Sequence, residues 1–499
     1  MMDKIKVLEV NNIDLPGRRF NGYNMIKEIS DNNISVKQTV IIKQSKNDSV
    51  IPLLSNGTFI NEYYKLQITE DKLSIHNVFS ITTPALLNLK EYKEADIVHF
   101  HMFHNTKLSI YSLIKIAEEK KVIISLHDPW FLTGRCVHFY DCLLWQKGCK
   151  KCPDLTTMFS FKEDNCQMLW KLKKYVFDNI DVDIVVPSKW MESLVKKSPI
   201  FKHNRNNVHF IPFGIDLKKF DSINTKDARA HYNLKDDEIV LFLRAQNEFK
   251  GTTYVLEALR KLKTNKKIVV LTCENKGLLD EVKNKYKIID LGMIKDKEMV
   301  YAMKACDIFL MPSKGESFGM MAIEAMASSK PVIVFDNTTL PSVVHANECG
   351  IAVKDRSEDE LRRAIEHLID NKEERERRGL LGKKICQEEY QLDRYNKDIK
   401  DLYNNVYLRV PKKRKQSSSF TKDPKIQALL HSAITSEEKK PNLNIDYSDP
   451  LIQEQIMLFN NEEYHRIKRE SKKFKNIVKN ILKKNNFLYN LIRKILRRN

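Results

Sequence analysis

Short apolar runs rich in β-branched residues alternate with amphipathic stretches through the first two hundred residues of the chain. These runs occupy residues 5–10, 39–42, 96–101, 122–127 and 183–187. β-Branched residues favour strands, and apolar residues that recur at steps of three and four favour helices. The alternation therefore predicts βαβ units that build a parallel sheet.

The same pattern starts again after residues 208–214. The second set of runs covers residues 238–244, 267–272, 288–291, 307–312 and 331–335. A weak internal echo supports the repeat, because Asp183 and Asp307 each begin a buried run that ends in Pro-Ser. We therefore predict an α/β fold with two Rossmann-like domains, residues 1–205 and 206–390, that face each other across a cleft. Open parallel sheets bind ligands at the carboxyl ends of their strands, so the chemistry is expected in this cleft.

The carboxyl-terminal part of the chain has a different organisation. Helical periodicity runs from residue 358 to 371 and from 392 to 407, and a stretch rich in Pro, Lys and Ser then breaks it. We predict a helix at residues 391–408, a linker and polar segment at 409–465, and a basic amphipathic helix at 466–499.

The positive charge of the chain is concentrated at its carboxyl-terminal end. Lys plus Arg number 85 and Asp plus Glu number 65, a net charge of +20, and residues 466–499 contain 13 basic residues but one acid, Glu470. Apolar residues recur there at steps of three and four, which predicts a basic helix that lies on an anionic membrane surface. The alternative is a helix whose apolar stripe packs on the protein body or on a partner. No aromatic-stacking motif accompanies the charge, so no nucleic-acid partner is expected.

The composition of the 499-residue chain, 42% hydrophobic and 30% charged, is typical of a globular protein. No apolar run approaches the roughly 18 residues of a membrane-spanning helix, and the first ten residues lack the apolar core of a signal peptide. We therefore expect a cytoplasmic protein that is peripheral at the inner face of the membrane. The nine cysteines are expected to be reduced thiols or metal ligands rather than a disulfide framework.

The most informative stretch is residues 312–327, in which a strand ends, a loop containing glycine follows, and a helix opens near Phe318. Free amides at the start of such a helix could hold a diphosphate, helped by the helix dipole. Glu316 and Glu324 are eight residues apart, about 12 Å along a helix, so their carboxylates could hold a sugar hydroxyl and a ribose hydroxyl of one elongated ligand. The residues of this stretch that are predicted to bind such a ligand are Ser317, Phe318, Gly319 and Glu324.

Glu316 and Glu324 resemble the E-x7-E motif of retaining glycosyltransferases that have the GT-B fold, family 4 in the usual sequence classification. In the same resemblance, Arg244 at the end of a predicted strand and Lys250 match the Arg and Lys that family members aim at the phosphates of the donor. Leu243 stands where a Gly commonly precedes that Arg. Two fixed cations would stabilise a nucleoside diphosphate as it leaves, in place of a metal ion. The alternative is two ordinary surface cations.

Two features of the first predicted domain belong to the same resemblance. Gly17 and Gly22 follow the first predicted strand, where glycines would let a phosphate or an acceptor come close to the backbone. Their segment is similar to a variant of the family's first glycine loop, so Gly17 and Gly22 are predicted to bind the donor together with Ser317, Phe318, Gly319 and Glu324. An ordinary strand-to-helix turn is the alternative. The segment is not the GxGxxG of a dinucleotide site. His127 ends an apolar run, and the family has a comparable residue that donates to a sugar hydroxyl or a phosphate; a structural histidine is the alternative. Three further histidines, expected as cleft lining or core, are His99, His101 and His104.

Four cysteines are concentrated in one short segment. They are Cys136, Cys142, Cys149 and Cys152. Structural Zn²⁺ held by four thiolates would tie down a loop too polar to pack by itself, and disulfides or free thiols are the alternatives. With His127 and Thr133-Gly-Arg-Cys136, the segment resembles a branch of the family that builds bacterial surface polysaccharides. Asp181-Val-Asp183 has the form of a metal-binding Asp-x-Asp motif but leads into a buried strand, so no metal is expected there.

The resemblance implies a retaining, metal-independent hexosyltransferase that requires no cofactor for catalysis. Its implied catalytic residues are His127, Arg244, Lys250 and Glu316. The first domain would bind a glycan or lipid-linked acceptor, the second would bind the nucleotide-sugar donor, and the helix at 391–408 would cross back to the first domain. Bacterial surface polysaccharide synthesis is the implied process. A non-catalytic sugar-nucleotide-binding membrane adaptor and a GT-B epimerase are the alternatives.

Overall fold

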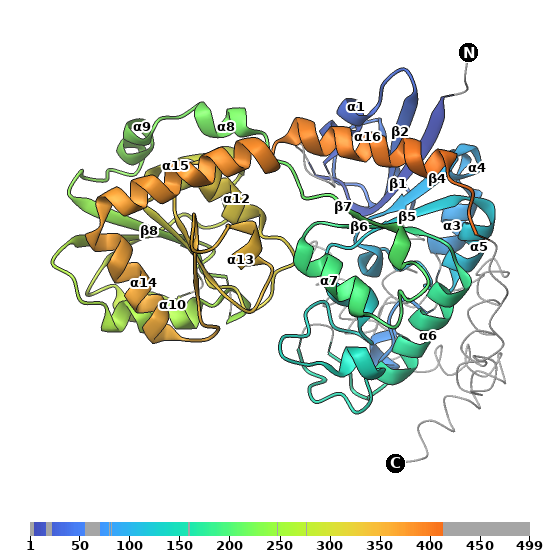
Figure 1. Cartoon of the computed structure of the whole chain (residues 1–499), viewed down its shortest axis with the longest axis horizontal. Helices are drawn as coiled ribbons and strands as arrows, with labels where there is room; N and C mark the ends of the chain where they lie inside the picture. Colours follow the sequence, from blue (N-terminus) through green and yellow to red (C-terminus); the bar gives the residue numbers. More distant parts are fainter. Residues whose placement is uncertain are drawn as a thin grey trace, which may run out of the picture.

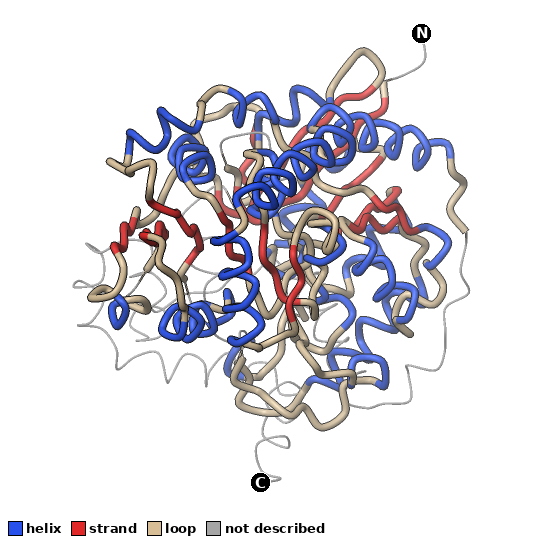
Figure 2. The backbone as a smooth tube through the Cα atoms, turned by 60° about the vertical axis from the view of Figure 1, so that its left-hand side comes forward, coloured by secondary structure: helices blue, strands red, loops and turns tan. Residues whose placement is uncertain are grey.

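The structure is a computed structural model, and it describes residues 4–15, 22–54, 70–78, 80, 82–157, 160–246, 248–275 and 277–412. Gly17 and the segments predicted after residue 412 lie outside the described residues. Two α/β domains lie next to each other (Figure 1), and the turned view shows their strands flanked by helices (Figure 2). In the part of the chain that the structure describes, no helix combines the length and the apolar content needed to cross a bilayer.

The first domain is built on a parallel sheet whose described strands have the order β3-β2-β1-β4-β5-β6-β7. Its strands are β1 (Ile5–Ile13), β2 (Ile34–Ile42), β3 (Val50–Pro52), β4 (Ile97–Phe100), β5 (Lys121–Ser125), β6 (Asp183–Val186) and β7 (Val208–Phe210). Its helices are α1 (Tyr23–Ile29), α3 (Thr82–Asn88), α4 (Lys90–Glu94), α5 (Ser112–Glu119), α6 (Cys166–Asn179) and α7 (Lys189–Lys197). The sheet continues to β7, just past the boundary predicted at residue 205. The strand order reverses between β1 and β4, which opens a crevice at the carboxyl edge.

The second domain repeats this plan with the strand order β10-β9-β8-β11-β12-β13. Its strands are β8 (Glu238–Arg244), β9 (Lys267–Cys273), β10 (Lys287–Asp290), β11 (Ile308–Met311), β12 (Val332–Phe335) and β13 (Ile351–Val353). Its helices are α8 (Leu217–Asp221), α9 (Thr225–His231), α10 (Thr252–Lys261), α11 (Asp296–Ala305), α12 (Met320–Ala327), α13 (Leu340–Val343), α14 (Glu358–Asp370) and α15 (Lys372–Glu389). The pairs between the named strands of both sheets are parallel, which confirms the predicted α/β class with two Rossmann-like domains.

The central strands are buried on both faces, as their continuous apolar sequences predict. In β12 the side chains of Val332, Ile333, Val334 and Phe335 are each 0% exposed. Successive residues of a strand point to opposite faces, so Val332 and Val334 belong to one core while Ile333 and Phe335 belong to another. A parallel sheet of this composition has to be covered by helices on both sides.

The helix α16 (Leu392–Leu408) returns from the second domain and lies along the first (Figure 1), as predicted for residues 391–408. Its apolar side packs against α1 and against one face of the first sheet. At the crossing, the amide of Ile215 donates to the carbonyl oxygen of Tyr390 at 2.9 Å, and the amide of Leu392 donates to that of Ile215 at 3.1 Å. The two chain segments that connect the domains are therefore bonded to each other.

The Asp-x-Asp sequence of the first domain holds the end of this helix. Arg409 places Nη1 2.5 Å from Oδ2 of Asp181 and Nη2 2.7 Å from Oδ2 of Asp183. Both carboxylates are almost fully buried, at 3% and 2% exposed, and a buried carboxylate needs such a partner. The two acids therefore serve the docking of α16.

Candidate active site

A cavity of about 540 Å³ lies between the two domains. Much of its lining follows the carboxyl ends of parallel strands, where open sheets bind ligands. The predicted site residues that line it are His127, Arg244, Lys250, Glu316, Ser317, Phe318, Gly319 and Glu324. Gly22 pairs with Leu15 in an isolated bridge and is not among the lining residues, and neither are the four clustered cysteines. The fold thus gathers the two cations, the two carboxylates and the histidine around one space.

Each of the two cations contacts a carboxylate. Lys250 Nζ lies 2.5 Å from Oε1 of Glu316, and the two side chains are 20% and 15% exposed. Arg244 ends β8 and donates from Nε to Glu274, which follows β9. Burial disfavours the charge on Arg244, but the Glu274 carboxylate outweighs burial and raises the pKa of the guanidinium. An anionic ligand in the cavity would therefore compete with Glu316 and Glu274 for these cations.

The start of α12 forms another part of the lining. The helix begins at Met320, two residues after the predicted position, and its N-cap is Gly319 with a φ of 99°. This backbone conformation favours glycine, and a Cβ at Gly319 would also displace Cδ2 of Leu340. Phe318 is 4% exposed and packs edge-on against Phe213, with ring centroids 5.1 Å apart. Its side chain therefore fixes the loop that leads into α12.

Two polar residues beside this helix start are nearly buried. Glu324, in the second turn of α12, is 6% exposed. Ser317 is 5% exposed, and its Oγ has no hydrogen-bond partner among the described residues. A buried polar group without a partner costs free energy, so a ligand oxygen that bonds to Ser317 would be favoured.

His127 follows β5 and lines the cavity from the first domain. Its ring stacks on Phe213, with centroids 5.5 Å apart and planes at 2°, and its Nε2 lies 3.0 Å from Nδ1 of His101. Burial lowers the pKa of His127 well below its usual value, and the charges of His101 and His104 act in the same direction. At neutral pH the imidazole of His127 that lines the cavity is therefore uncharged.

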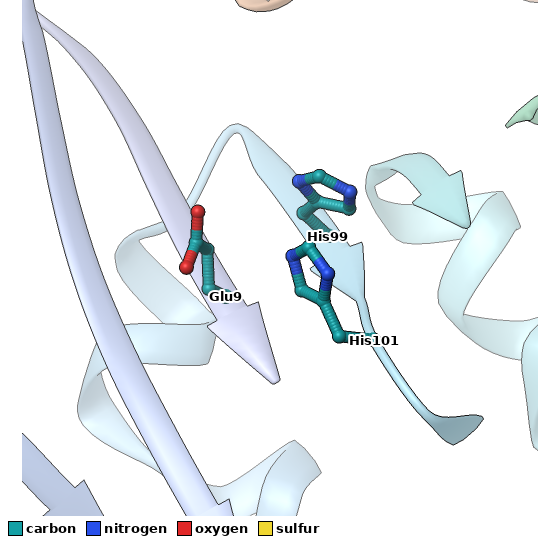
Figure 3. Close-up of side chains that lie close together, drawn as sticks. All are labelled: Glu9, His99 and His101. Atoms are coloured by element: carbon teal, nitrogen blue, oxygen red, sulfur yellow. The ribbon is translucent and has the colours of Figure 1, made fainter. Parts of the chain in front are cut away.

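Next to His127, a buried polar group links the first sheet to α16. Glu9 on β1 and His99 on β4 are cross-strand partners, and Figure 3 shows them beside His101. Within the described ranges, these three form the group of potential metal ligands whose atoms lie within 4.8 Å of one another. The Tyr403 hydroxyl on α16 donates to Oε1 of Glu9 at 2.9 Å and lies 2.9 Å from Nδ1 of His99. Because this hydroxyl already lies between the carboxylate and the imidazole, we assign the group to the docking of α16.

The four clustered cysteines lie between β5 and α6. All nine cysteines of the chain are free thiols, and burial raises the pKa of Cys136 to about 11 and that of Cys149 to about 12. Among the residues that the structure describes, no three thiols have sulfur atoms within 4.8 Å of one another. Cys166, at the start of α6, interacts with Cys152 and is a further thiol that the spacing did not indicate.

Several cavity residues were not expected from the sequence. Among them are Met102, His138, Phe213 and Glu274. Glu274 follows β9, so its position at the carboxyl end of a strand was an available signal. His138 lies in the cysteine-rich segment and Phe213 in the connection between domains, and only the folded chain brings them to the cavity.

Solved structures share this architecture. The sucrose-phosphate synthase from Thermosynechococcus elongatus superposes with a TM-score of 0.56 at 16% identity, over 81% of this chain and 99% of that one. The Anabaena protein HepE, in its complex with UDP, gives a TM-score of 0.55 at 14% identity, over 80% of this chain and 100% of that one. At such identities the likeness concerns the fold. The protein therefore belongs to the class with the GT-B architecture of two facing Rossmann-like domains.

The sequence of the second domain is similar to a known family. Residues 224–384 match the family model described as Glycosyl transferases group 1. The MMP alpha-(1->4)-mannosyltransferase of Mycolicibacterium hassiacum is 24% identical over 218 residues, 42% of this chain and 51% of that protein. The putative colanic acid biosynthesis glycosyl transferase WcaC of Escherichia coli is 33% identical over 88 residues, 16% of this chain and 22% of that protein. The chain spans about half or less of the length of these two relatives.

Proposed function

We propose that the protein is a retaining, metal-independent glycosyltransferase that moves a hexose from a nucleoside-diphosphate donor to a glycan or lipid-linked acceptor. The observation that carries the proposal is the shared cavity, in which Arg244, Lys250, Glu316 and the start of α12 face His127 of the other domain. The match to the group 1 family supports the same reaction class.

In this proposal the two cations bind the diphosphate of the donor. Lys250 and Arg244 exchange their contacts with Glu316 and Glu274 for phosphate oxygens when the donor enters. The negative charge on the phosphate grows as the glycosidic bond breaks, so fixed cations and the first amides of α12 stabilise the transition state more than the ground state. The released Glu316 carboxylate is then available to a hydroxyl of the transferred sugar, and Glu324 to the ribose.

The acceptor hydroxyl attacks from the same face of the sugar that the diphosphate leaves. The departing phosphate takes the proton of that hydroxyl, so the protein supplies no nucleophile. His127, held neutral by burial, donates a hydrogen bond to a sugar hydroxyl or a phosphate oxygen. The acceptor therefore approaches from the first domain.

The ligands of one protein with the same fold agree with a nucleotide-sugar donor. HepE of Anabaena has been crystallised with UDP and with UDP-glucose, and it shares the fold of this chain. WcaC is named for colanic acid biosynthesis and WaaG is described as a lipopolysaccharide biosynthesis enzyme, which supports a role in bacterial surface polysaccharide synthesis.

The test is a screen of nucleotide sugars with the full chain by thermal shift, followed by transfer assays with each donor that stabilises it. A ligand at 100 times its Kd should raise the free energy of unfolding by about 2.7 kcal/mol. Glu316→Gln should abolish most transfer, whereas Glu257→Gln, at an exposed pair with Arg260, should leave it unchanged. Binding without transfer would favour a non-catalytic adaptor, and normal turnover of Glu316→Gln would refute the role of that carboxylate.

We also propose that residues 466–499, which lie outside the described residues, bring the enzyme to the inner face of the membrane, where lipid-linked acceptors are found. Their 13 basic residues against one acid provide the attraction to anionic lipids. Deleting them should release the protein from anionic vesicles and leave transfer to water-soluble acceptors intact. Vesicle binding that survives the deletion would place the contact elsewhere.

Structural zinc at Cys136, Cys142, Cys149 and Cys152 stays a prediction. A tetrahedral site would require the sulfur atoms to come closer together than they lie in the described structure. Elemental analysis of the purified full chain decides it, since a bound ion would appear at one zinc per chain and would be lost in Cys→Ser variants.

A further inference from the structure

Residues 134–157, named the strap here, form a long connection in the first domain between the 3-10 turn at Pro129–Leu132 and α6. The strap contains the four clustered cysteines, but its contacts are not confined to its own domain. Its tip, residues 138–141, touches three loops of the second domain.

Buried cations hold the base of the strap. Arg135, 1% exposed, donates from Nη1 to the carbonyl oxygen of Thr157 at 2.6 Å and from Nη2 to that of Asp154, so it joins the two ends of the strap. Lys173 of α6, also 1% exposed, donates to the carbonyl oxygen of Thr133 at 2.9 Å. A segment tied at both ends in this way presents its tip at a defined position.

Aromatic rings at the tip pack on the loop that carries Lys250. The rings of His138 and Phe249 have centroids 4.9 Å apart, and Tyr140 meets the same Phe249 ring edge-on at 6.2 Å. The loop that carries Glu316 is equally close, because a Cβ at Gly315 would lie 2.9 Å from Cγ of His138. His138 thus fills the space between the two loops and also lines the cavity.

A charged contact also joins the tip of the strap to the second domain. Asp141 accepts from Nη1 of Arg356 at 2.6 Å and from Nδ2 of Asn337 at 3.3 Å. Arg356 follows β13 and Asn337 follows β12, so the strap meets the carboxyl edge of the second sheet. The strap therefore spans the cleft from one sheet edge to the other.

The residues that the strap covers immediately precede the two members of the cation–carboxylate pair. Phe249 comes before Lys250, and Gly315 comes before Glu316. We infer that His138 is a positioning residue for the Lys250–Glu316 pair, and that the strap carries it across the cleft. The inference deepens the proposed function and rests on it only for the assignment of the pair to the donor.

Hydrogen exchange on the full chain without ligand provides a test that does not need activity. The amide of Lys314 donates to the carbonyl oxygen of Phe249 at 3.0 Å and so reports whether the two loops stay together. His138→Ala should speed exchange at Lys314 several-fold, because the side chain that packs on both loops is lost. If His138→Ala does not fold, Tyr140→Ala removes the second ring contact and is read out in the same way. Unchanged exchange at Lys314 overturns the inference.

A conservative variant separates positioning from direct chemistry. His138→Phe keeps a ring against Phe249, so it should retain slow exchange at Lys314 and most of the transfer activity that His138→Ala loses. A His138→Phe variant that keeps slow exchange but is as inactive as His138→Ala would show that the imidazole nitrogens act directly, and the positioning role would be wrong.

The contact between Asp141 and Arg356 can be tested by enzyme kinetics. An exposed ion pair contributes a factor of up to about five to an equilibrium, so Asp141→Asn should lower kcat/KM for the donor by about two- to fivefold, through kcat, KM or both. The matched control is Asp237→Asn, which removes an exposed pair with Lys267, 2.6 Å, inside the second domain and should change neither constant. An unchanged kcat/KM for the donor, or an equal effect of the control, contradicts the inference.

The two proposals can fail separately. A wild-type protein that transfers no sugar would sink the proposed function, while exchange at Lys314 would still decide whether the strap positions the loops. Efficient transfer together with exchange that is insensitive to His138→Ala would sink the strap inference alone.

Discussion

The hydroxyl of Ser188 in the first domain donates a hydrogen bond of 2.9 Å to the carbonyl oxygen of Ser317 in the second. Ser188 is the N-cap of α7, where its Oγ also accepts from the amide of Met191 at 3.2 Å, and Ser317 directly follows Glu316. The two serines are 2% and 5% exposed, so water does not compete for the bond. A helix cap of one domain therefore holds the catalytic loop proposed in the other.

Ser188→Ala should therefore lower the free energy of unfolding by more than the loss of a helix cap that acts within one domain. A lost N-cap costs about 1 kcal/mol, and the lost bond across the domains adds about 1 kcal/mol. Ser357→Ala is the matched control, because Ser357 caps α14 by accepting from the amide of Glu360 at 3.2 Å within one domain. Urea unfolding should show a loss of about 2 kcal/mol for Ser188→Ala and about 1 kcal/mol for Ser357→Ala. Equal losses would show that the bond across the domains contributes nothing.

Removing either cation of the cavity should slow transfer. Arg244→Ala and Lys250→Ala should each raise the barrier by about 2 to 4 kcal/mol, as expected for lost groups that stabilise developing charge. The measurement is kcat/KM for the donor identified in the screen. Lys267→Ala, at a side chain that is 69% exposed, should leave kcat/KM near the wild-type value. Wild-type kcat/KM in both cavity variants would refute the assignment of these cations.

The glycine after Lys250 should tolerate no side chain. Gly251 has a φ of 74°, and a Cβ there would overlap the carbonyl oxygen of Pro312. Gly251→Ala should lower the free energy of unfolding by about 2 to 4 kcal/mol, from backbone strain and overpacking together. Gly292→Ala isolates the strain, because Gly292 has a φ of 62° and nothing within 4 Å of an added Cβ, and it should cost about 1 kcal/mol. Similar losses in urea unfolding would mean that the overlap with Pro312 is relieved.

The buried carboxyl group of Glu9 should make the free energy of unfolding depend on pH. Burial raises the folded-state pKa of Glu9 to about 7 from its ordinary value of 4.5, while the hydrogen bond from Tyr403 acts in the opposite direction. Between these two pKa values the folded state keeps a proton that the unfolded state releases. The stability that Glu9 contributes through this proton is therefore fully present below pH 4.5 and is lost as the pH rises through 7. The loss amounts to about 3 kcal/mol at most.

Glu9→Gln keeps an acceptor for Tyr403 and removes the titration. Urea unfolding from pH 5 to pH 8 should show that the variant gains stability relative to wild type as the pH rises. The control is Glu119→Gln, because Glu119 accepts from the hydroxyl of Tyr92 at 2.9 Å but is exposed. A constant difference between Glu9→Gln and wild type over this range would contradict the shifted pKa.

The sequence predicted the strands well because a buried parallel strand needs a continuous apolar run. The run at 331–335 became β12 (Val332–Phe335), and the helix predicted at 391–408 became α16 (Leu392–Leu408). The spacing of Glu316 and Glu324 could also be interpreted locally, since both lie within one loop and the helix that follows it.

The partners of these residues could not be predicted in the same way. Glu274, which holds Arg244, is 30 residues away in the chain, and Tyr403, which bonds to Glu9, is 394 residues away. No local periodicity reports contacts between such distant segments. The cysteine-rich segment shows the same limit, because nothing in its sequence indicated that its tip contacts the second domain through Asp141 and Arg356.

The order of apolar and polar residues alone determined two parallel sheets and the ends of most strands, and the spacing of Glu316 and Glu324 along the chain carried the resemblance to a family motif. These features depend on neighbours in the chain, so local propensity and burial are enough to set them. Tertiary structure alone decided that Lys250 pairs with Glu316, that His138 packs between their loops, and that Ser188 bonds to Ser317. Such contacts exist because two separately folded sheets meet along their carboxyl edges, and only the packing of whole domains sets which side chains face each other there.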